Sequence, residues 1–165
     1  MNLKSFFGFS EEKIEAALDL DKDGIIGEYY ENELPVIVKF NKRIPHETTQ
    51  SKLPILTVIS WSYDGSQRNG MPLNQVNQRI IELEKAITNG NSKNRLYKHA
   101  YSRIGNNLKE LVYYSSSQEE FMQNLNKVLS KHERYPIDIE FYEDKEWSEF
   151  KKLLNDFNIN GKIKS

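Results

Sequence analysis

Apolar and polar residues alternate along several stretches of the chain, and a period of two is typical of β-strands. The clearest stretch is ILTVISWSY at 55–63, which is rich in β-branched and aromatic side chains. The other stretches with this pattern are GEYYE at 27–31, LPVIVKF at 34–40, NRLYKHAYSR at 94–103, LKELVYY at 108–114 and the run after Pro136. The first two of these predict one hairpin and the next two predict another, so six strands are expected.

Two long stretches instead repeat apolar residues every three or four positions, which is typical of helices. Residues 73–89 form the first, and Gly90 stands where a C-terminal cap belongs. The second, 117–130, begins with Ser117 and Glu120 in the spacing of a capping box. The residues that predict the two apolar faces are Val76, Ile80, Leu83 and Ile87, then Phe121, Leu125, Val128 and Leu129.

Both ends of the chain predict a further helix. Ser10 suits the N-cap position before EEKIEAAL, with two glutamates in the first turn. Asp144 suits the same position before a last helix, in which Trp147 and Phe150 share an apolar face and Trp147 is expected to anchor the core. The polar segment 41–52 contains Pro45 and is predicted to be a loop.

The order of these elements predicts the fold class. From residue 54 onward it is strand, helix, strand, strand, helix, strand, helix, which indicates an α+β fold with a ferredoxin-like βαββαβ antiparallel sheet. An N-terminal helix and hairpin precede this unit, and an extra C-terminal helix follows it. Right-handed crossovers place the helices at 73–89 and 117–130 on the same side of the sheet. Residues 1–165 are expected to form a single domain, in which 1–26 hold the first helix and an Asp-rich turn and 27–157 hold the body.

The composition excludes several classes of function. None of the 165 residues is a cysteine, which excludes a disulfide framework, a thiolate zinc site, an iron–sulfur cluster and a cysteine nucleophile. The 23 basic and 24 acidic residues give a net charge of −1, so nucleic acid is not an expected partner. No apolar run approaches the ~20 residues of a membrane helix, and no signal peptide is visible. We therefore expect a soluble, cytoplasmic protein that does not enter a membrane.

The sharpest local motif is an Asp-rich turn, DLDKDGII at 19–26. A calcium loop of the EF-hand type takes oxygen ligands from positions 1, 3 and 5, and has glycine at 6 and a backbone carbonyl ligand at 7. Asp19, Asp21, Asp23 and the carbonyl of Ile25 fit this pattern, so calcium is the one cofactor that the sequence indicates. Position 12 is Tyr30 instead of a bidentate glutamate, and a solvated turn without a metal is therefore the favoured interpretation.

Aromatic and cationic side chains gather on one predicted strand. Alternation puts four of them on one face, and a tryptophan lies on a nearby strand. Such a face could stack nucleic-acid bases, but acidic side chains on the same sheet would repel phosphate. Because Tyr, Trp and Arg anchor protein interfaces, an unknown protein partner is the favoured occupant. In the alternative interpretation these rings pack beneath the N-terminal hairpin or the last helix. The candidate binding residues are Trp61, Tyr97, His99, Tyr101 and Arg103.

Recognisable catalytic motifs are absent, including H-E-x-x-H, a Walker A loop, G-x-G-x-x-G and G-x-S-x-G. A non-enzymatic protein-binding or regulatory module is therefore the leading hypothesis. The first alternative is an enzyme whose site contains Asp138, Glu140 and His99, and it predicts that these groups converge in a pocket. The second alternative is a calcium-stabilised structural domain, which predicts a melting temperature that rises with calcium.

Several motifs together resemble a known family. ELPVIVKFN, ISWSY, NGMP, EEFMQNLNKVL and YPIDIEFYEDKEWSEF are similar to the bacterial family known as domain of unknown function 695, from Gly27 to Phe157. The resemblance implies a bacterial origin and a small soluble domain without an assigned activity. It also implies a link to proteins that carry a domain similar to the regulator that inhibits ribonuclease E, itself ferredoxin-like. It supplies no catalytic residues, and residues 1–26 lie outside the matching motifs.

Overall fold

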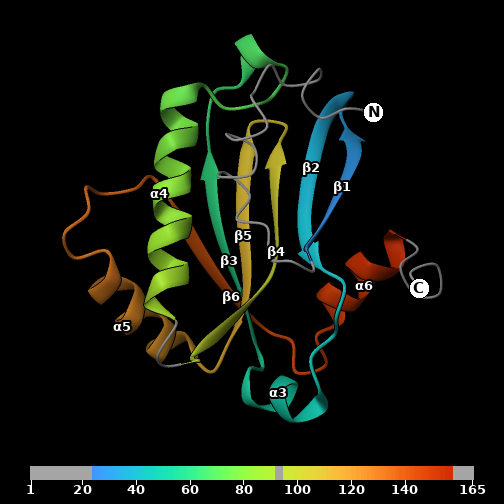
Figure 1. Cartoon of the computed structure of the whole chain (residues 1–165), viewed down its shortest axis with the longest axis vertical. Helices are drawn as coiled ribbons and strands as arrows, with labels where there is room; N and C mark the ends of the chain where they lie inside the picture. The colour runs from blue at the N-terminus through green and yellow to red at the C-terminus, as the bar shows by residue number, and fades with distance from the viewer. Residues whose placement is uncertain (1–23, 92–94, 158–165) are drawn as a thin grey trace.

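The computed structural model describes residues 24–91 and 95–157. Within these ranges the chain forms one sheet of six strands in the order β1-β2-β4-β5-β3-β6, and each neighbouring pair is antiparallel (Figure 1). The strands are β1 (Gly24–Glu31), β2 (Leu34–Asn41), β3 (Ile55–Ser62), β4 (Tyr97–Gly105), β5 (Leu108–Ser115) and β6 (Asp138–Glu143). The helices are α3 (Glu47–Lys52), α4 (Asn74–Gly90), α5 (Gln118–Val128) and α6 (Ser148–Asp156), with a short 3-10 turn η1 (Ser66–Arg68). In the described ranges, none of the helices has the length and apolar character needed to cross a bilayer.

The predicted α+β class and the six predicted strands are confirmed. Both hairpins turn through pairs of residues with positive φ, Asn32 with Glu33 and Asn106 with Asn107. Such two-residue loops match the right-handed twist of the strands that they join. β1 begins at Gly24, earlier than the predicted start at Gly27, and the β1–β2 hairpin extends the sheet beyond β4.

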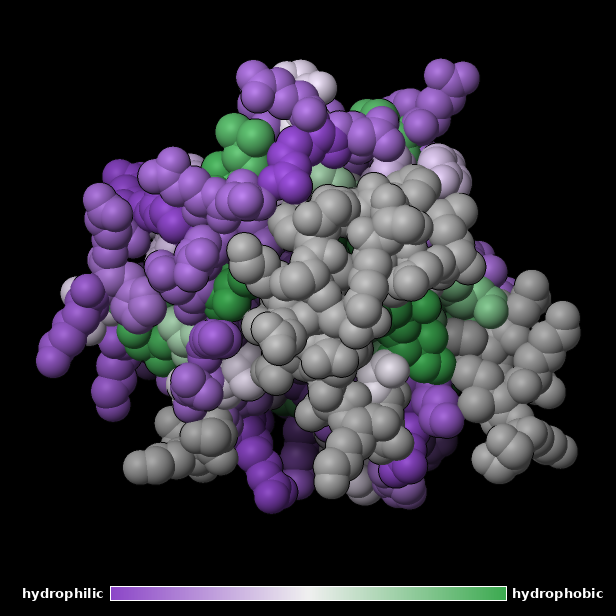
Figure 2. Space-filling view, turned by 45° about the horizontal axis from the view of Figure 1, so that its top comes forward, coloured by the Kyte–Doolittle hydropathy of each residue, from purple (hydrophilic) through white to green (hydrophobic). Residues whose placement is uncertain are grey.

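α4 and α5 cover the same face of the sheet, as predicted (Figure 1). Their apolar residues and the inward residues of the strands form one buried cluster, because each helix turns only one stripe towards the sheet. The described surface on the side of α4, at the left of Figure 2, is mostly hydrophilic. The helix residues in the buried cluster are Ile80, Leu83, Ile87, Phe121 and Leu125.

Of the two caps predicted for α4 and α5, the structure contains the one at the start of α5 and not the one at the end of α4. The Ser117 hydroxyl accepts a hydrogen bond from the Glu120 backbone N–H at 3.2 Å, so the predicted cap of α5 is confirmed. Gly90, in contrast, is the last residue of α4 and not its cap. A Cβ atom at Gly90 would lie 2.4 Å from Cγ2 of Val128, so a glycine is required where the two helices approach each other. The predicted capping role of Gly90 is therefore wrong.

The opposite face of the sheet carries a second buried cluster, built around Trp147 and α6. Trp147 is 1% exposed, and its indole N–H donates a hydrogen bond to the Leu53 carbonyl at 3.0 Å. Phe150 and Leu154 of α6 lie in the same cluster. The prediction that Trp147 anchors the core is confirmed, and α6 lies near one end of the sheet (Figure 1).

The segment 41–52, predicted to be a loop, ends in the helix α3. His46 caps this helix, since its Nδ1 atom accepts a hydrogen bond from the Thr48 backbone N–H at 3.3 Å. Gln50 is buried, and its side-chain amide donates to the Pro45 carbonyl at 2.7 Å. A helix this short is stabilised by such contacts and not by an apolar stripe. Its polar sequence therefore gave no periodic signal, and the loop prediction is wrong for α3.

Candidate functional site

The predicted binding residues of β4 do not share one face, because the strand contains a β-bulge. The pairing of β4 with β5 shifts between His99 and Tyr101, where Ala100 is the extra residue. An extra residue reverses the alternation of the side chains that follow it. Tyr97 and His99 therefore face α4 and α5, whereas Tyr101 and Arg103 face the opposite side. The prediction of one aromatic face on this strand is wrong.

Two of the predicted binding residues belong to the core. Trp61 and Tyr97 are 5% and 4% exposed. The Tyr97 hydroxyl donates to the Ile87 carbonyl at 2.7 Å, and burial raises the pKa of Tyr97 to about 12. The Arg79 guanidinium lies over the Trp61 ring, 5.6 Å from its centroid. Both rings are enclosed by their own protein and offer little surface to a partner.

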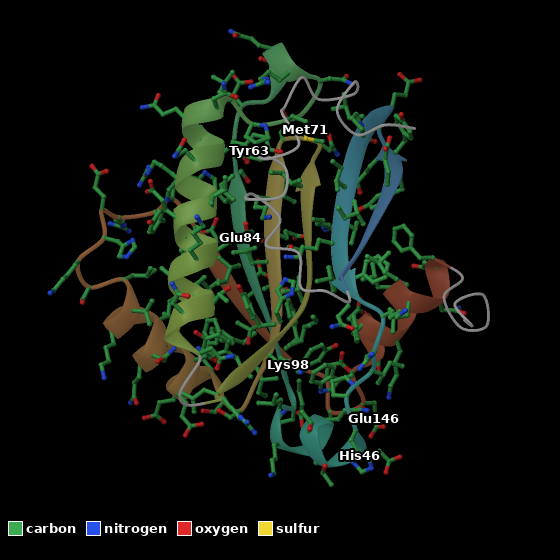
Figure 3. All side chains as sticks on the ribbon, viewed as in Figure 1. His46, Tyr63, Met71, Glu84, Lys98 and Glu146 are labelled. Atoms are coloured by element: carbon green, nitrogen blue, oxygen red, sulfur yellow. The ribbon has the colours of Figure 1, made fainter. Side chains whose placement is uncertain are left out.

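His99 is a neutral, partly buried side chain on the α4 side of the sheet. Its ring packs against Tyr113 with the centroids 5.4 Å apart. Burial, together with the positive charges of Lys39 and Lys109, lowers the pKa of His99 to about 3. Lys109 also pairs at 2.9 Å with Glu84, which Figure 3 labels on α4. His99 therefore carries no charge at neutral pH.

The residues of the alternative catalytic site do not converge. Asp138 and Glu140 of β6 pair with Ser60 and Val58 of β3, on the face of the sheet opposite His99. The sheet itself separates the two carboxylates from the imidazole. The hypothesis of an active site that contains all three groups is therefore wrong.

The calcium hypothesis concerns a turn that lies mostly beyond the described ranges. Asp19, Asp21 and Asp23 fall outside the described residues, and Ile25 lies in β1, where it pairs with Phe40. Among residues 24–91 and 95–157, no three His, Cys, Asp or Glu side chains are grouped to hold a metal ion. Calcium binding at the turn stays a prediction.

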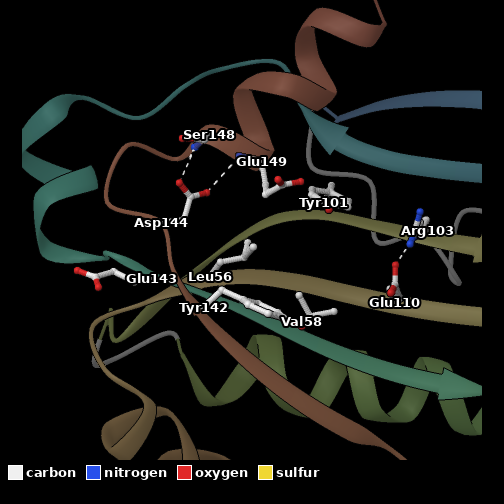
Figure 4. Close-up of a pocket in the computed structure, with 10 residues that line it drawn as sticks. All are labelled: Leu56, Val58, Tyr101, Arg103, Glu110, Tyr142, Glu143, Asp144, Ser148 and Glu149. Atoms are coloured by element: carbon white, nitrogen blue, oxygen red, sulfur yellow. Dashed lines mark hydrogen bonds and ion pairs between the residues drawn. The ribbon is translucent and has the colours of Figure 1, made fainter.

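A groove lies between the sheet and the start of α6, on the face opposite α4 (Figure 4). Its volume is about 420 Å³. Leu56 and Val58 of β3 give it an apolar floor, and two tyrosine rings and several charged groups surround them. The other lining residues are Tyr101, Arg103, Glu110, Tyr142, Glu143, Asp144, Ser148 and Glu149. The structure thus brings Tyr101 and Arg103 together in one site.

Arg103 is the cation in the lining of the groove, and it is already paired. Its Nε–H donates to the Glu110 carboxylate, and its Nη1–H donates to the Tyr29 hydroxyl at 3.2 Å. Burial alone would lower the pKa of Arg103, but these two partners raise it above the ordinary value. Because the Glu110 side chain is only 14% exposed, the two opposite charges neutralise each other within the protein.

Asp144 fixes the start of α6 at the rim of the groove. Its carboxylate accepts hydrogen bonds from the backbone N–H groups of Ser148 and Glu149, at 2.8 and 3.1 Å (Figure 4). The Tyr114 hydroxyl donates to the same carboxylate at 2.6 Å. Burial opposes the charge, but these bonds lower the pKa of Asp144 below its ordinary value. The Asp144 carboxylate thus accepts from the first turn of α6, but Trp147 occupies the N-cap position, so the position predicted for Asp144 is wrong.

The two remaining carboxylates of the groove are more exposed. Glu143 pairs with Lys145 at 2.7 Å, but both side chains are over 60% exposed, and such surface pairs contribute little. The Glu149 side chain has no hydrogen-bond or ion-pair partner among the residues that the structure describes. The groove therefore carries more negative than positive charge.

Sequence reasoning missed the groove because it depends on the order of the strands. The acidic alternation of β6 is visible in the sequence, but by itself it indicates only a hydrated face of a strand. β3 lies between β5 and β6, so Glu110 and Tyr142 reach the same site although they are far apart in the chain. No local pattern carries that information.

The fold and the groove define an α+β protein with helices on both faces of one antiparallel sheet and an acidic groove beside its last helix. Residues 30–155 match the model of a family of unknown function, DUF695. The chain therefore belongs to this family, which confirms the resemblance seen in its motifs. No curated protein and no solved structure matches the chain. A bacterial origin and a link to the ribonuclease E inhibitor stay predictions.

Proposed function

We propose that this protein is a binding module whose groove beside α6 holds a cationic segment of a partner protein. The observation that carries the proposal is the charge of the lining, with four carboxylates against the single guanidinium of Arg103. The Lys145 that pairs with Glu143 lies outside the lining. Since Arg103 is paired with Glu110, the other three acidic residues of the lining are without an opposite charge there. Lysine or arginine side chains of a partner would supply it.

The uncharged part of the groove suits the same ligand. Lysine and arginine have long apolar stems, and Leu56 and Val58 offer an apolar floor for them. The rings of Tyr101 and Tyr142 can face the charged ends of these side chains. Burial raises the pKa of Tyr101 to about 12, so its hydroxyl stays neutral and available for hydrogen bonding.

The charge of the groove also favours a protein partner over nucleic acid. Carboxylates repel phosphate groups, and affinity for nucleic acid rests mainly on neutralising phosphates. The paired Arg103 offers no compensation. This supports the expectation, already drawn from the net charge, that nucleic acid is not the partner.

A labelled peptide tests the proposal. The probe is a fluorescein-labelled octapeptide of alternating lysine and threonine, and its binding is measured by fluorescence anisotropy at low ionic strength. The wild-type protein is expected to bind this peptide and to ignore one of alternating glutamate and threonine. The double variant Glu143→Gln/Glu149→Gln is expected to bind the lysine peptide about five- to tenfold more weakly.

The control is a double variant with the same change of charge elsewhere. Glu82→Gln/Glu119→Gln alters two exposed carboxylates on α4 and α5, across the sheet from the groove. This variant is expected to keep nearly the wild-type affinity. Equal loss of affinity in both double variants would contradict a site in the groove, and so would a failure of the wild-type protein to bind the lysine peptide.

The finer assignment of the fold is also part of the proposal, with β3, α4, β4, β5, α5 and β6 as a ferredoxin-like unit. The strand order β4-β5-β3-β6 and the position of both helices on one face support it. The β1–β2 hairpin and α6 would then be additions to this unit. An experimentally determined structure with a different strand order would contradict the assignment.

Two further expectations from the sequence stay part of the proposal. A cytoplasmic location is one of them, and localisation of the tagged full chain tests it. Calcium binding at the Asp-rich turn is the other. A melting temperature that rises at millimolar calcium in the wild-type protein, but not in Asp21→Ala, would support it. An unchanged melting temperature in both proteins would contradict it.

A further inference from the structure

The outer edge of β6 is open in the described structure. β6 is the last strand in the order of the sheet and pairs only with β3, from Asp138 opposite Ser60 to Glu143 opposite Ile55. The pairing runs without a bulge, and the strand contains no proline. Figure 4 draws β6 in front of β3, with no strand along its outer side. Neither of two common devices that block an edge, a bulge or a proline, is present in β6.

The register decides which backbone groups point towards this edge. The Asp144 N–H donates to the Pro54 carbonyl at 2.9 Å, so these two residues form a hydrogen-bonded pair. In an antiparallel ladder such pairs alternate with pairs that are not hydrogen-bonded. The N–H and C=O groups that point away from β3 are therefore those of Ile139, Phe141 and Glu143. Within residues 24–91 and 95–157, these groups have no backbone hydrogen-bond partner.

The side chains of β6 define the charge of this edge. Asp138, Glu140 and Tyr142 project to the same face as the groove, and Tyr142 is 49% exposed. Tyr142 and Glu143 also line the groove itself, so the edge and the groove form one continuous surface. A strand added here would place every second side chain beside a carboxylate.

We propose that the cationic partner segment adds to the edge of β6 as an antiparallel strand and continues into the groove. This inference rests on the proposed function, and it names the conformation of the bound segment. Added strands gain affinity from main-chain hydrogen bonds and specificity from alternate side chains. An antiparallel orientation follows from the rest of the sheet, in which each neighbouring pair of strands is antiparallel.

Charge selects the occupant of this edge. A second copy of the chain would bring its own Asp138 and Glu140 against the same residues, and like charges directly opposite each other destabilise a strand pair. A segment with lysine or arginine at every second position places them opposite Glu140 and Asp138 instead. The occupant is therefore an extended basic segment of another protein.

Backbone methylation of the probe peptide tests the proposal without altering the protein. In an antiparallel pair, residues opposite Glu140 have side chains on the groove face and backbone N–H groups that point away from β6. Residues opposite Phe141 direct their N–H groups to β6. With lysine on the groove face, N-methylation of the threonines removes the pairing bonds, and N-methylation of the lysines leaves them intact. Both methylated octapeptides keep the same charge.

The expected result is a split between the two methylated peptides. The threonine-methylated peptide is expected to bind the full-length protein at least about tenfold more weakly than the unmethylated one, and the lysine-methylated peptide within about twofold. Equal affinity of all three peptides would overturn strand addition while leaving the groove proposal intact. Loss of binding with lysine methylation would overturn the antiparallel orientation. If the unmethylated peptide does not bind, the proposed function fails, and this inference fails with it.

Discussion

The Tyr114 ring lies flat against the indole of Trp147, with the ring centroids 3.9 Å apart and the planes inclined by 8°. The hydroxyl of the same tyrosine donates to the Asp144 carboxylate at 2.6 Å and accepts from the Phe150 backbone N–H at 3.3 Å. One residue of β5 therefore positions both the first turn of α6 and the carboxylate that accepts hydrogen bonds from it. Because that turn forms a wall of the groove, the core contact and the candidate site depend on each other.

Trp147→Ala tests this dependence. Removing a fully buried indole is expected to lower the free energy of unfolding by about 3–5 kcal/mol. It also leaves the buried Leu53 carbonyl without its donor. Urea denaturation measures the change, and Trp147→Phe, which keeps a ring but not the N–H, is expected to lose less. A loss below about 1 kcal/mol in the alanine variant would contradict an anchoring role.

Gly90→Ala tests the close approach of α4 and α5. Alanine usually stabilises a helix interior relative to glycine, by roughly 1 kcal/mol. At Gly90 the added Cβ would meet Val128, whose β-branched side chain has little rotamer freedom in a helix, so we expect destabilisation. The double variant Gly90→Ala/Val128→Ala is expected to lose less free energy of unfolding than the sum of the losses in the two single variants. Additive effects in this double-mutant cycle would contradict the contact.

Much of the fold could be predicted from local patterns. The six strands and the helices α4, α5 and α6 follow from apolar periods, and the cap at Ser117 follows from local chemistry. α3 could not be predicted, because its stability comes from contacts such as the bond from Gln50 to the Pro45 carbonyl. The sequence around Gly90 predicts a cap, whereas the structure requires a glycine there because Val128 of α5 lies against it.

The candidate site was less accessible to prediction. Strict alternation placed Tyr97, His99, Tyr101 and Arg103 on one face, and the single extra residue Ala100 divides them between two. A bulge has no dependable signal in one sequence, because its cause is the fit between neighbouring strands. The excess of negative charge around Arg103 depends on which strands become neighbours in the sheet. The order of the strands along the chain does not predict that.

The pH dependence of stability tests the environment of His99. Its pKa is lowered to about 3 in the folded protein from an ordinary value of 6.5, so below pH 6.5 the unfolded chain takes up a proton that the folded protein does not. The free energy of unfolding is therefore expected to fall between pH 6.5 and 4.5, by at most ~1.4 kcal/mol per pH unit.

The comparison for this prediction is His99→Gln, which cannot titrate. Urea denaturation of both proteins at several pH values is expected to give a shallower decline in the variant. Carboxylates begin to take up protons towards pH 4.5, but both proteins contain the same carboxylates, so the difference between the two curves reports on His99. Parallel declines in the two proteins would contradict the environment assigned to His99.

Arg103→Gln separates two possible roles of the guanidinium. Removing it leaves Glu110 unpaired, so we expect a less stable protein and a more acidic groove. The lysine–threonine octapeptide is expected to bind this variant about two- to fivefold more tightly at low ionic strength, with the gain lost at high salt. Weaker binding, measured by anisotropy in the folded variant, would instead indicate that Arg103 contacts the ligand directly.

The most direct test of the binding site is a titration followed by nuclear magnetic resonance. The ¹⁵N-labelled protein is titrated with the lysine–threonine octapeptide, and backbone shifts are mapped onto the structure. Changes are expected at Val58, Tyr101, Tyr142 and Glu149, while Ile87 and Phe121 beneath the other face stay unchanged. Shifts centred on α4 and α5, with none around the groove, would contradict the central claim.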